Sequence, residues 1–231
     1  MGRVIDDFCP PILKRQLWHL KLKWMQSRFY AVQSSTVHEQ DLKIYSDQSM
    51  ADTLEQWGAG SVWEEIQYLL INCHGKVLDI ACGPGGTMRL LAKYSDLELH
   101  GIDISDLLIN QGIKRGIDPM RLRVGDATSM PYEDNSFDHG YSIGSLEHFT
   151  DQGILDMLGE CKRVVSKATF HMIPVSRNGQ NQGWLKTVQS FHNNSVEWWL
   201  EKYKSAYSDV TVLSSKWEDE LSIGKWFICR H

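Results

Sequence analysis

Residues 76–87 read Lys-Val-Leu-Asp-Ile-Ala-Cys-Gly-Pro-Gly-Gly-Thr, an apolar run that passes directly into a glycine-rich turn. The apolar half is typical of a buried parallel strand. Gly83, Gly85 and Gly86 allow the backbone to turn tightly and to approach a ligand closely. The next residues, 88–94, have the composition of a helix. Strand, glycine turn and helix in this order indicate the ligand-binding corner of a doubly wound α/β domain.

The alternation of strand and helix continues along the chain. We expect strands at 76–80, 97–102, 122–124, 139–143 and 168–173, with helices at about 86–94, 105–115 and 151–164. This order predicts a mainly parallel sheet with helices on both faces. Two last strands, at 210–214 and 226–230, are joined by about a dozen residues, which favours an antiparallel pair.

The flanking segments have a different character. Residues 12–30 carry Leu13, Leu17, Leu20 and Trp24 at helical spacing among basic residues, which predicts a basic amphipathic helix. We expect residues 1–60 to form a helical lid on a main domain at 61–231, and contact of 12–30 with an anionic membrane surface or with a second subunit is an alternative. A helical insertion is expected at about 175–205, with helices at about 184–191 and after Asn194.

Composition narrows the class of protein. The 231 residues carry a formal net charge of −5 and are 42% hydrophobic, which suits one folded unit and gives no basic face for nucleic acid. The five cysteines are widely spaced and lack any CxxC pair, so neither a disulfide framework nor a zinc site is expected. No stretch has the roughly 18 apolar residues of a membrane span, so we expect a cytoplasmic protein.

Three further features follow the strands of the predicted sheet. Asp103 ends the second strand about 20 residues after the glycine turn, where a carboxylate can accept both hydroxyls of a ribose. Asp126 ends the third strand, where its side chain can reach an adenine amine. The fourth strand ends in small residues and then presents Glu147 and His148. Ligands of open α/β sheets bind at these carboxyl ends.

On these residues the chain resembles the class I S-adenosylmethionine-dependent methyltransferases over about residues 60–175 and, more loosely, over the last two strands. The resemblance implies S-adenosylmethionine as cofactor and a seven-stranded sheet of order 3-2-1-4-5-7-6 with the last strand antiparallel. Ala81 stands where the family more usually has glycine. The resemblance assigns these residues to the cofactor site: Asp79, Ala81, Gly83, Gly85, Asp103, Ile104, Asp126, Ala127 and Ser142.

A sulfonium is already a strong methyl donor, so such an enzyme must chiefly align the reactants and exclude water. For a hydroxyl acceptor, His148 is the first candidate for the base, with Glu147 as a second catalytic candidate or substrate contact. His192 and Tyr45 are weaker candidates. No carboxylate cluster suggests a metal. We expect O-methylation of a small polar molecule such as a sugar or a glycosylated intermediate, with N-methylation of a small amine as alternative.

Two other classes remain open. An NAD(P)-dependent oxidoreductase also uses a glycine turn and an acid, but its fingerprint requires a third glycine where Met88 stands. The other alternative is a non-catalytic subunit that binds S-adenosylmethionine and serves a partner enzyme.

Overall fold

The computed structural model describes residues 33–34, 40–55, 57–186 and 189–231. The amphipathic helix predicted at 12–30 lies outside these residues. Most of the described chain surrounds one sheet with strand order β4-β3-β2-β5-β6-β10-β9. Its strands are β2 (Gly75–Ile80), β3 (Leu97–Asp103), β4 (Leu122–Val124), β5 (Phe137–Ile143), β6 (Val165–Ser176), β9 (Asp209–Glu218) and β10 (Ser222–Arg230).

The direction of each strand agrees with the prediction. β4, β3, β2, β5 and β6 pair in parallel, whereas β10 is antiparallel to both β6 and β9. Numbered along the sheet strands alone, this is the order 3-2-1-4-5-7-6, so the predicted fold class is confirmed. The turn between β9 and β10 is short enough that only an antiparallel return is possible.

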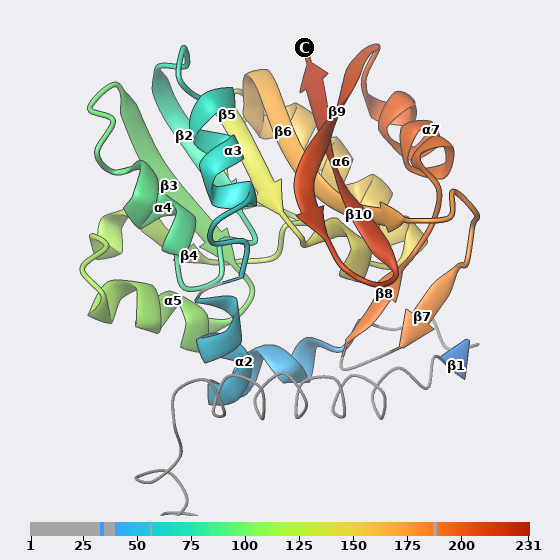
Figure 1. The fold of residues 1–231 in the computed structure, drawn as a ribbon. Coiled ribbons are helices and arrows are strands. Elements are labelled where there is room, and N and C mark those ends of the chain that lie inside the picture. The colour runs from blue at the N-terminus through green and yellow to red at the C-terminus, as the bar shows by residue number, and fades with distance from the viewer. Residues whose placement is uncertain (1–32, 35–39, 56, 187–188) are drawn as a thin grey trace, which may run out of the picture.

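Helices cover both faces of the sheet, and Figure 1 shows α3 in front of it and α6 behind it. On one face, Val62 and Ile66 of α3 pack with Leu91, whereas on the other Met157 of α6 packs with Trp199 of α7. The helices are α2 (Gln48–Leu54), α3 (Val62–Leu69), α4 (Gly86–Leu91), α5 (Asp106–Lys114), α6 (Asp151–Val164) and α7 (Val196–Ala206). Short 3-10 helices lie at η1 (Leu42–Ser46), η2 (Pro119–Arg121) and η3 (Leu146–His148).

The helix predicted at about 184–191 is wrong. Two short antiparallel strands, β7 (Trp184–Lys186) and β8 (Ser190–His192), are found there instead, and β7 also pairs with β1 (Gln33–Ser34). Cross-strand packing explains the difference, because the rings of the paired residues Trp184 and His192 meet edge to face with centroids 4.6 Å apart. The helix after Asn194 is present as α7, whose first turn is capped by the hydroxyl of Ser195.

The described residues contain no helix long and apolar enough to cross a membrane.

Candidate functional site

A cavity of about 870 Å³ lies at the carboxyl ends of β2, β3, β4 and β5. Its floor is formed by the loops that follow these strands. Its remaining walls come from residues 40–57, from β8 and from the β9–β10 turn, all distant in sequence from the glycine turn. A volume of this size is within the range of small-molecule sites, roughly 300 to 1,000 Å³.

Asp79, at the end of β2, is a buried acid in the cavity wall. Burial raises the pKa of its carboxyl to about 8, although the hydroxyl of Tyr141 donates a hydrogen bond of 2.8 Å to Oδ2 and opposes the shift. The neighbouring Asp103 raises the pKa further. A cationic group bound here would stabilise the ionised carboxylate, so this position suits the amino group of an amino acid.

The turn after β2 passes through the left-handed backbone region at three residues, Ala81 (φ 58°), Gly83 (φ 54°) and Gly85 (φ 71°). A Cβ at Gly83 would meet no protein atom within 4 Å, and Gly83 lines the cavity. A Cβ at Gly85 would lie 2.3 Å from Cδ1 of Ile117. Gly83 therefore leaves room for a ligand, whereas Gly85 leaves room for the protein's own packing.

Asp103 connects the glycine turn to the end of β3. Its Oδ2 accepts a hydrogen bond of 2.8 Å from the N–H of Gly83, and Oδ1 accepts one of 2.9 Å from Ser105. Burial raises the pKa of Asp103, and these two hydrogen bonds act in the opposite direction. Each carboxylate oxygen has a second acceptor site, so the side chain can still receive the hydroxyls of a ribose. The exposed side chain of Ile104 lies beside it in the cavity wall.

Asp126 and Ala127 line the cavity in the loop between β4 and β5. Oδ1 of Asp126 accepts hydrogen bonds of 2.8 Å from both the N–H and the hydroxyl of Thr128. These bonds orient the carboxylate just where the chain leaves β4. An amine at the edge of a planar ring is a suitable partner for it.

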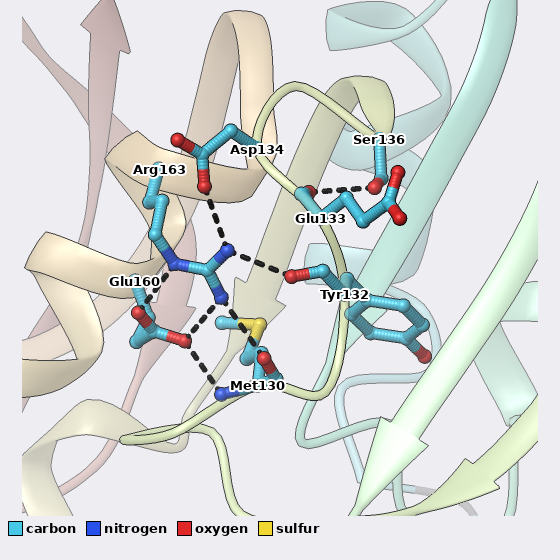
Figure 2. A network of polar contacts seen from close by, with 7 residues as sticks. All are labelled: Met130, Tyr132, Glu133, Asp134, Ser136, Glu160 and Arg163. Atoms are coloured by element: carbon cyan, nitrogen blue, oxygen red, sulfur yellow. Dashed lines mark hydrogen bonds and ion pairs between the residues drawn. The ribbon is translucent and has the colours of Figure 1, made fainter.

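The same loop is held from behind by Arg163 of α6 (Figure 2). The guanidinium donates to the carbonyl oxygens of Met130 and Tyr132 at 2.9 and 2.7 Å. It also binds Glu160 and Asp134, and Glu160 accepts in turn from the N–H of Met130. One planar side chain thus fixes the loop that carries Asp126.

Two residues assigned to the cofactor site do not line the cavity. Ser142 is fully buried, and its hydroxyl lies 2.8 Å from Nδ1 of His171 in the interior. Gly85 faces Ile117, as described above. The cavity does contain the other seven: Asp79, Ala81, Gly83, Asp103, Ile104, Asp126 and Ala127.

His148, at the end of η3, reaches the cavity from the loop after β5. Its Nδ1 lies 2.8 Å from the carbonyl oxygen of Ser190, which can only accept, so Nδ1 carries the proton and Nε2 carries the lone pair. Burial lowers the pKa of His148, although the bond to Ser190 opposes the shift. The ring is therefore neutral near pH 7 and has one nitrogen ready to accept a proton.

Glu147 lies next to this nitrogen. Its Oε1 is 3.7 Å from Nε2 of His148, and its Oε2 is buried without a hydrogen-bond partner among the described residues. Burial raises the pKa of Glu147 to about 8, so the carboxyl is mainly protonated at neutral pH. A protonated carboxyl can donate a hydrogen bond to a substrate oxygen, whereas His148 can accept one.

Sequence reasoning missed the residues that hold His148 in place. Asp41 accepts hydrogen bonds from the N–H and the hydroxyl of Ser190, at 3.2 and 2.9 Å. Partial burial of Asp41 raises its pKa, but these bonds and the ion pair with Lys186 outweigh it and leave the pKa lowered. Nothing in the local sequence pairs residue 41 with residue 190, because this contact depends on the β7–β8 hairpin.

Residues 40–55 and 57 form a strap along the cavity. Tyr45 lines it, and burial beside Glu147 and Asp103 raises the pKa of its hydroxyl. The carbonyl oxygen of Tyr45 accepts a hydrogen bond of 2.6 Å from Ser105. At the end of α2, Glu55 binds Arg89 of α4 and Arg115 at the end of α5. These contacts fasten the strap to the cofactor side of the sheet.

His192, the other weaker candidate, does not line the cavity and packs instead among the rings of Trp184, Trp198 and Trp199. Within the described part of the chain, no group of three or more His, Cys, Asp or Glu side chains is arranged to hold a metal ion.

Comparison with known proteins agrees with this geometry. Residues 77–168 match the family model of a methyltransferase domain. The chain is 38% identical over 78 residues to 24-methylenesterol C-methyltransferase 2 of Arabidopsis thaliana, covering 32% of this chain and 22% of that protein. It is 41% identical over 81 residues to ajmaline N-methyltransferase of Rauvolfia serpentina. This match covers 33% of this chain and 28% of that protein. The chain thus spans less than a third of the length of these relatives.

Solved structures share the fold over more of the chain. A methyltransferase from Methanosarcina mazei has a TM-score of 0.59 at 16% identity and covers 71% of this chain and 96% of its own. A methyltransferase from Aquifex aeolicus has a TM-score of 0.56 at 16% identity. This match covers 79% of this chain and 98% of the Aquifex chain. Both are described as dependent on S-adenosylmethionine.

Proposed function

Because the chain belongs to the class I S-adenosylmethionine-dependent methyltransferases through its domain at residues 77–168, we propose that it transfers a methyl group from this cofactor to a small acceptor molecule. The observation that carries the proposal is the arrangement of Asp79, Gly83, Asp103 and Asp126 around one cavity at the carboxyl edge of the sheet.

The acidic groups of the cavity fit S-adenosylmethionine. The buried carboxyl of Asp79 suits its amino group, and the carboxylate of Asp103 suits the ribose hydroxyls. Asp126 suits the adenine amine, and Gly83 provides a surface without a side chain for the methionine end. When bound, the cofactor supplies an electrophilic methyl group, and the residues of this chain orient it and exclude water.

We assign His148 as the base for a hydroxyl acceptor. Its Nε2 carries the lone pair, and the strap and the β7–β8 hairpin shield it from bulk water. Glu147 donates a hydrogen bond to the acceptor in its protonated form and is the second catalytic candidate. A hydroxyl of a sugar or of a glycosylated intermediate is the acceptor favoured by sequence. An amine acceptor needs only to lose its proton before attack, and the relatives that methylate nitrogen favour it as the second candidate.

The domain division proposed here treats residues 1–60 as a lid on the methyltransferase domain at 61–231. Support comes from the strap, because residues 40–57 line the cavity and are bonded to Arg89, Ser105 and Arg115.

The decisive experiment compares ligands by calorimetry on the full chain. We expect S-adenosylmethionine to bind and NAD⁺ not to bind, because Met88 occupies the position of the third glycine and its sulfur fills the space beside Gly101. Asp103→Ala should abolish binding of S-adenosylmethionine. Unchanged affinity in this variant would contradict the cofactor assignment. Cofactor binding without methyl transfer to any molecule of a broad acceptor panel would favour a non-catalytic partner subunit.

A further inference from the structure

Several large rings line the cavity, and four of them lie outside the glycine turn and the residues that flank it. Trp57, Phe149, Phe191 and Trp217, here called the aromatic wall, come from four separate segments, and each is only partly buried. The rings of Trp57 and Trp217 lie with centroids 5.6 Å apart and planes inclined by 42°. These rings therefore give part of the cavity an apolar lining.

The position of Trp57 in the aromatic wall requires a glycine at residue 144. Gly144, directly after β5, has a φ of +62°, and a Cβ there would lie 2.4 Å from Cη2 of Trp57. The indole of Trp57 thus rests on the backbone next to η3, the short helix that ends at His148. The aromatic wall and the proposed base are consequently parts of one local arrangement.

Carboxyl side chains recur in the cavity lining. Within the described ranges, six acids and no lysine or arginine line it: Asp47, Asp79, Asp103, Asp126, Glu147 and Asp219. Nearby cations are already paired, since Arg89 and Arg115 bind Glu55 and Lys186 binds Asp41. At the cofactor end, Asp79, Asp103 and Asp126 offset the positive groups of the donor.

We propose that the acceptor is a neutral or cationic molecule with a flat, largely apolar ring system, and that molecules carrying a carboxylate or a phosphate are excluded. This inference rests on the methyltransferase function proposed above. Among the described residues that line this cavity, an anion that leaves water meets no lysine or arginine, and its lost hydration is not replaced. A flat ring, by contrast, buries its faces against the aromatic wall. A glycosylated aromatic compound satisfies both this inference and the acceptor favoured by sequence.

The test uses four probes that share one naphthalene ring and differ in a single substituent: hydroxymethyl, aminomethyl, carboxylate and phosphate. The full chain is saturated with S-adenosylhomocysteine, and probe affinity is measured by tryptophan fluorescence and calorimetry. We expect the alcohol and the amine to bind at least about tenfold more tightly than the two anions. Equal or tighter binding of an anion would overturn the charge selection, and failure of all four probes would overturn the ring selection.

Substitutions in the cavity lining test the ring contact and the charge selection separately. Trp217→Leu should weaken binding of the alcohol about fivefold, whereas Trp198→Leu, a partly buried tryptophan outside the cavity, should leave it unchanged. Leu221→Arg, which places a cation in the cavity lining, should strengthen binding of the carboxylate probe. Binding of S-adenosylhomocysteine is measured first: its absence contradicts the proposed function, whereas its presence with unselective probes contradicts only the acceptor class.

Discussion

His148 donates its Nδ1–H to the carbonyl oxygen of Ser190 across 2.8 Å, which fixes the ring in the tautomer whose Nε2 accepts protons. Because Ser190 is itself bound by Asp41, the orientation of the base depends on two segments that are 149 residues apart. The bond joins the strap, the β7–β8 hairpin and the loop after β5 into one site.

His148→Gln should lower turnover of a hydroxyl acceptor by about 100-fold, since an amide cannot take the proton. Cofactor affinity should change little, because none of the cofactor contacts proposed above uses this side chain. Steady-state kinetics and calorimetry measure the two effects. His74→Gln is the matched control at an exposed position outside the cavity, and a wild-type rate in His148→Gln would remove His148 from the mechanism.

The pH profile tests the same residue. Burial lowers the pKa of His148 below its usual 6.5, and only the neutral ring can act as base. Activity should therefore fall on acidification with a midpoint below 6.5 and should be independent of His148 protonation near neutral pH. This acid limb should be absent from the residual activity of His148→Gln.

Asp79→Asn should stabilise the protein while it weakens cofactor binding. The pKa of Asp79 is about 8 in the folded chain and about 3.9 when unfolded. Between these values the folded state holds a proton that the unfolded state has released, so stability decreases as the pH rises through this window. Each pH unit costs the wild type up to about 1.4 kcal/mol.

Thermal unfolding at pH 5 and pH 8 measures this effect. The gain in melting temperature of Asp79→Asn should be larger at pH 8, and the amide oxygen retains an acceptor for Tyr141. An equal gain at both pH values would contradict the raised pKa.

Ala81→Gly should stabilise the protein by about 1 kcal/mol, because alanine at a φ of 58° holds a strained left-handed conformation that glycine adopts freely. Chemical denaturation measures the change. The control is Ala92→Gly at the end of α4, where φ is −59° and the same substitution should instead destabilise by about 0.5 to 1 kcal/mol. A loss of stability in Ala81→Gly would show that the turn is not strained.

Gly83→Ala should reduce affinity for S-adenosylmethionine at least about tenfold, because the new methyl group points into space that the protein leaves open. Gly179→Ala is the control, since its φ of +71° is similarly left-handed and its Cβ also meets no neighbour, but it lies outside the cavity. Both variants should lose similar stability, and only Gly83→Ala should lose the cofactor. Equal cofactor affinity in Gly83→Ala and Gly179→Ala would show that the cofactor does not bind against Gly83.

Arg163→Lys should destabilise the protein by about 1 to 2 kcal/mol, because lysine cannot reproduce the planar set of bonds to Met130, Tyr132 and Glu160. Cofactor affinity should fall with it, since the loop that carries Asp126 loosens. Arg230→Lys, at an exposed ion pair with Asp209, should change stability by less than about 0.5 kcal/mol. If Arg163→Lys keeps normal cofactor affinity, the loop that Arg163 holds does not contribute to cofactor binding.

The parts of the fold that follow from local pattern could be predicted from the sequence. The apolar run before Asp79 and the glycines after it define a buried strand and a tight turn whatever surrounds them. The strand order was expected from the resemblance to the methyltransferase family, whereas the short connection between the last two strands predicted only that these two are antiparallel.

The parts that depend on distant contacts could not be predicted. β7 pairs with both β8 and β1, and this tertiary pairing overrides the helical interpretation of the sequence. Ser142 follows the strand pattern of its neighbours, yet its hydroxyl turns inward to His171. The aromatic wall draws on Trp57 and Trp217, whose proximity no spacing in the sequence reveals.

The proposed cofactor site and the aromatic wall come from different parts of the chain, and the strap contributes to the wall. The cofactor contacts proposed above lie within 79–127, inside the matched methyltransferase domain, whereas the aromatic wall takes Trp57, Phe191 and Trp217 from outside it. Only Phe149 of the aromatic wall lies inside the matched domain, so most of the proposed acceptor surface comes from the flanking segments. Exchange of these flanking segments between related enzymes would be a direct route to new substrates that leaves the methyl donor and the sheet unchanged.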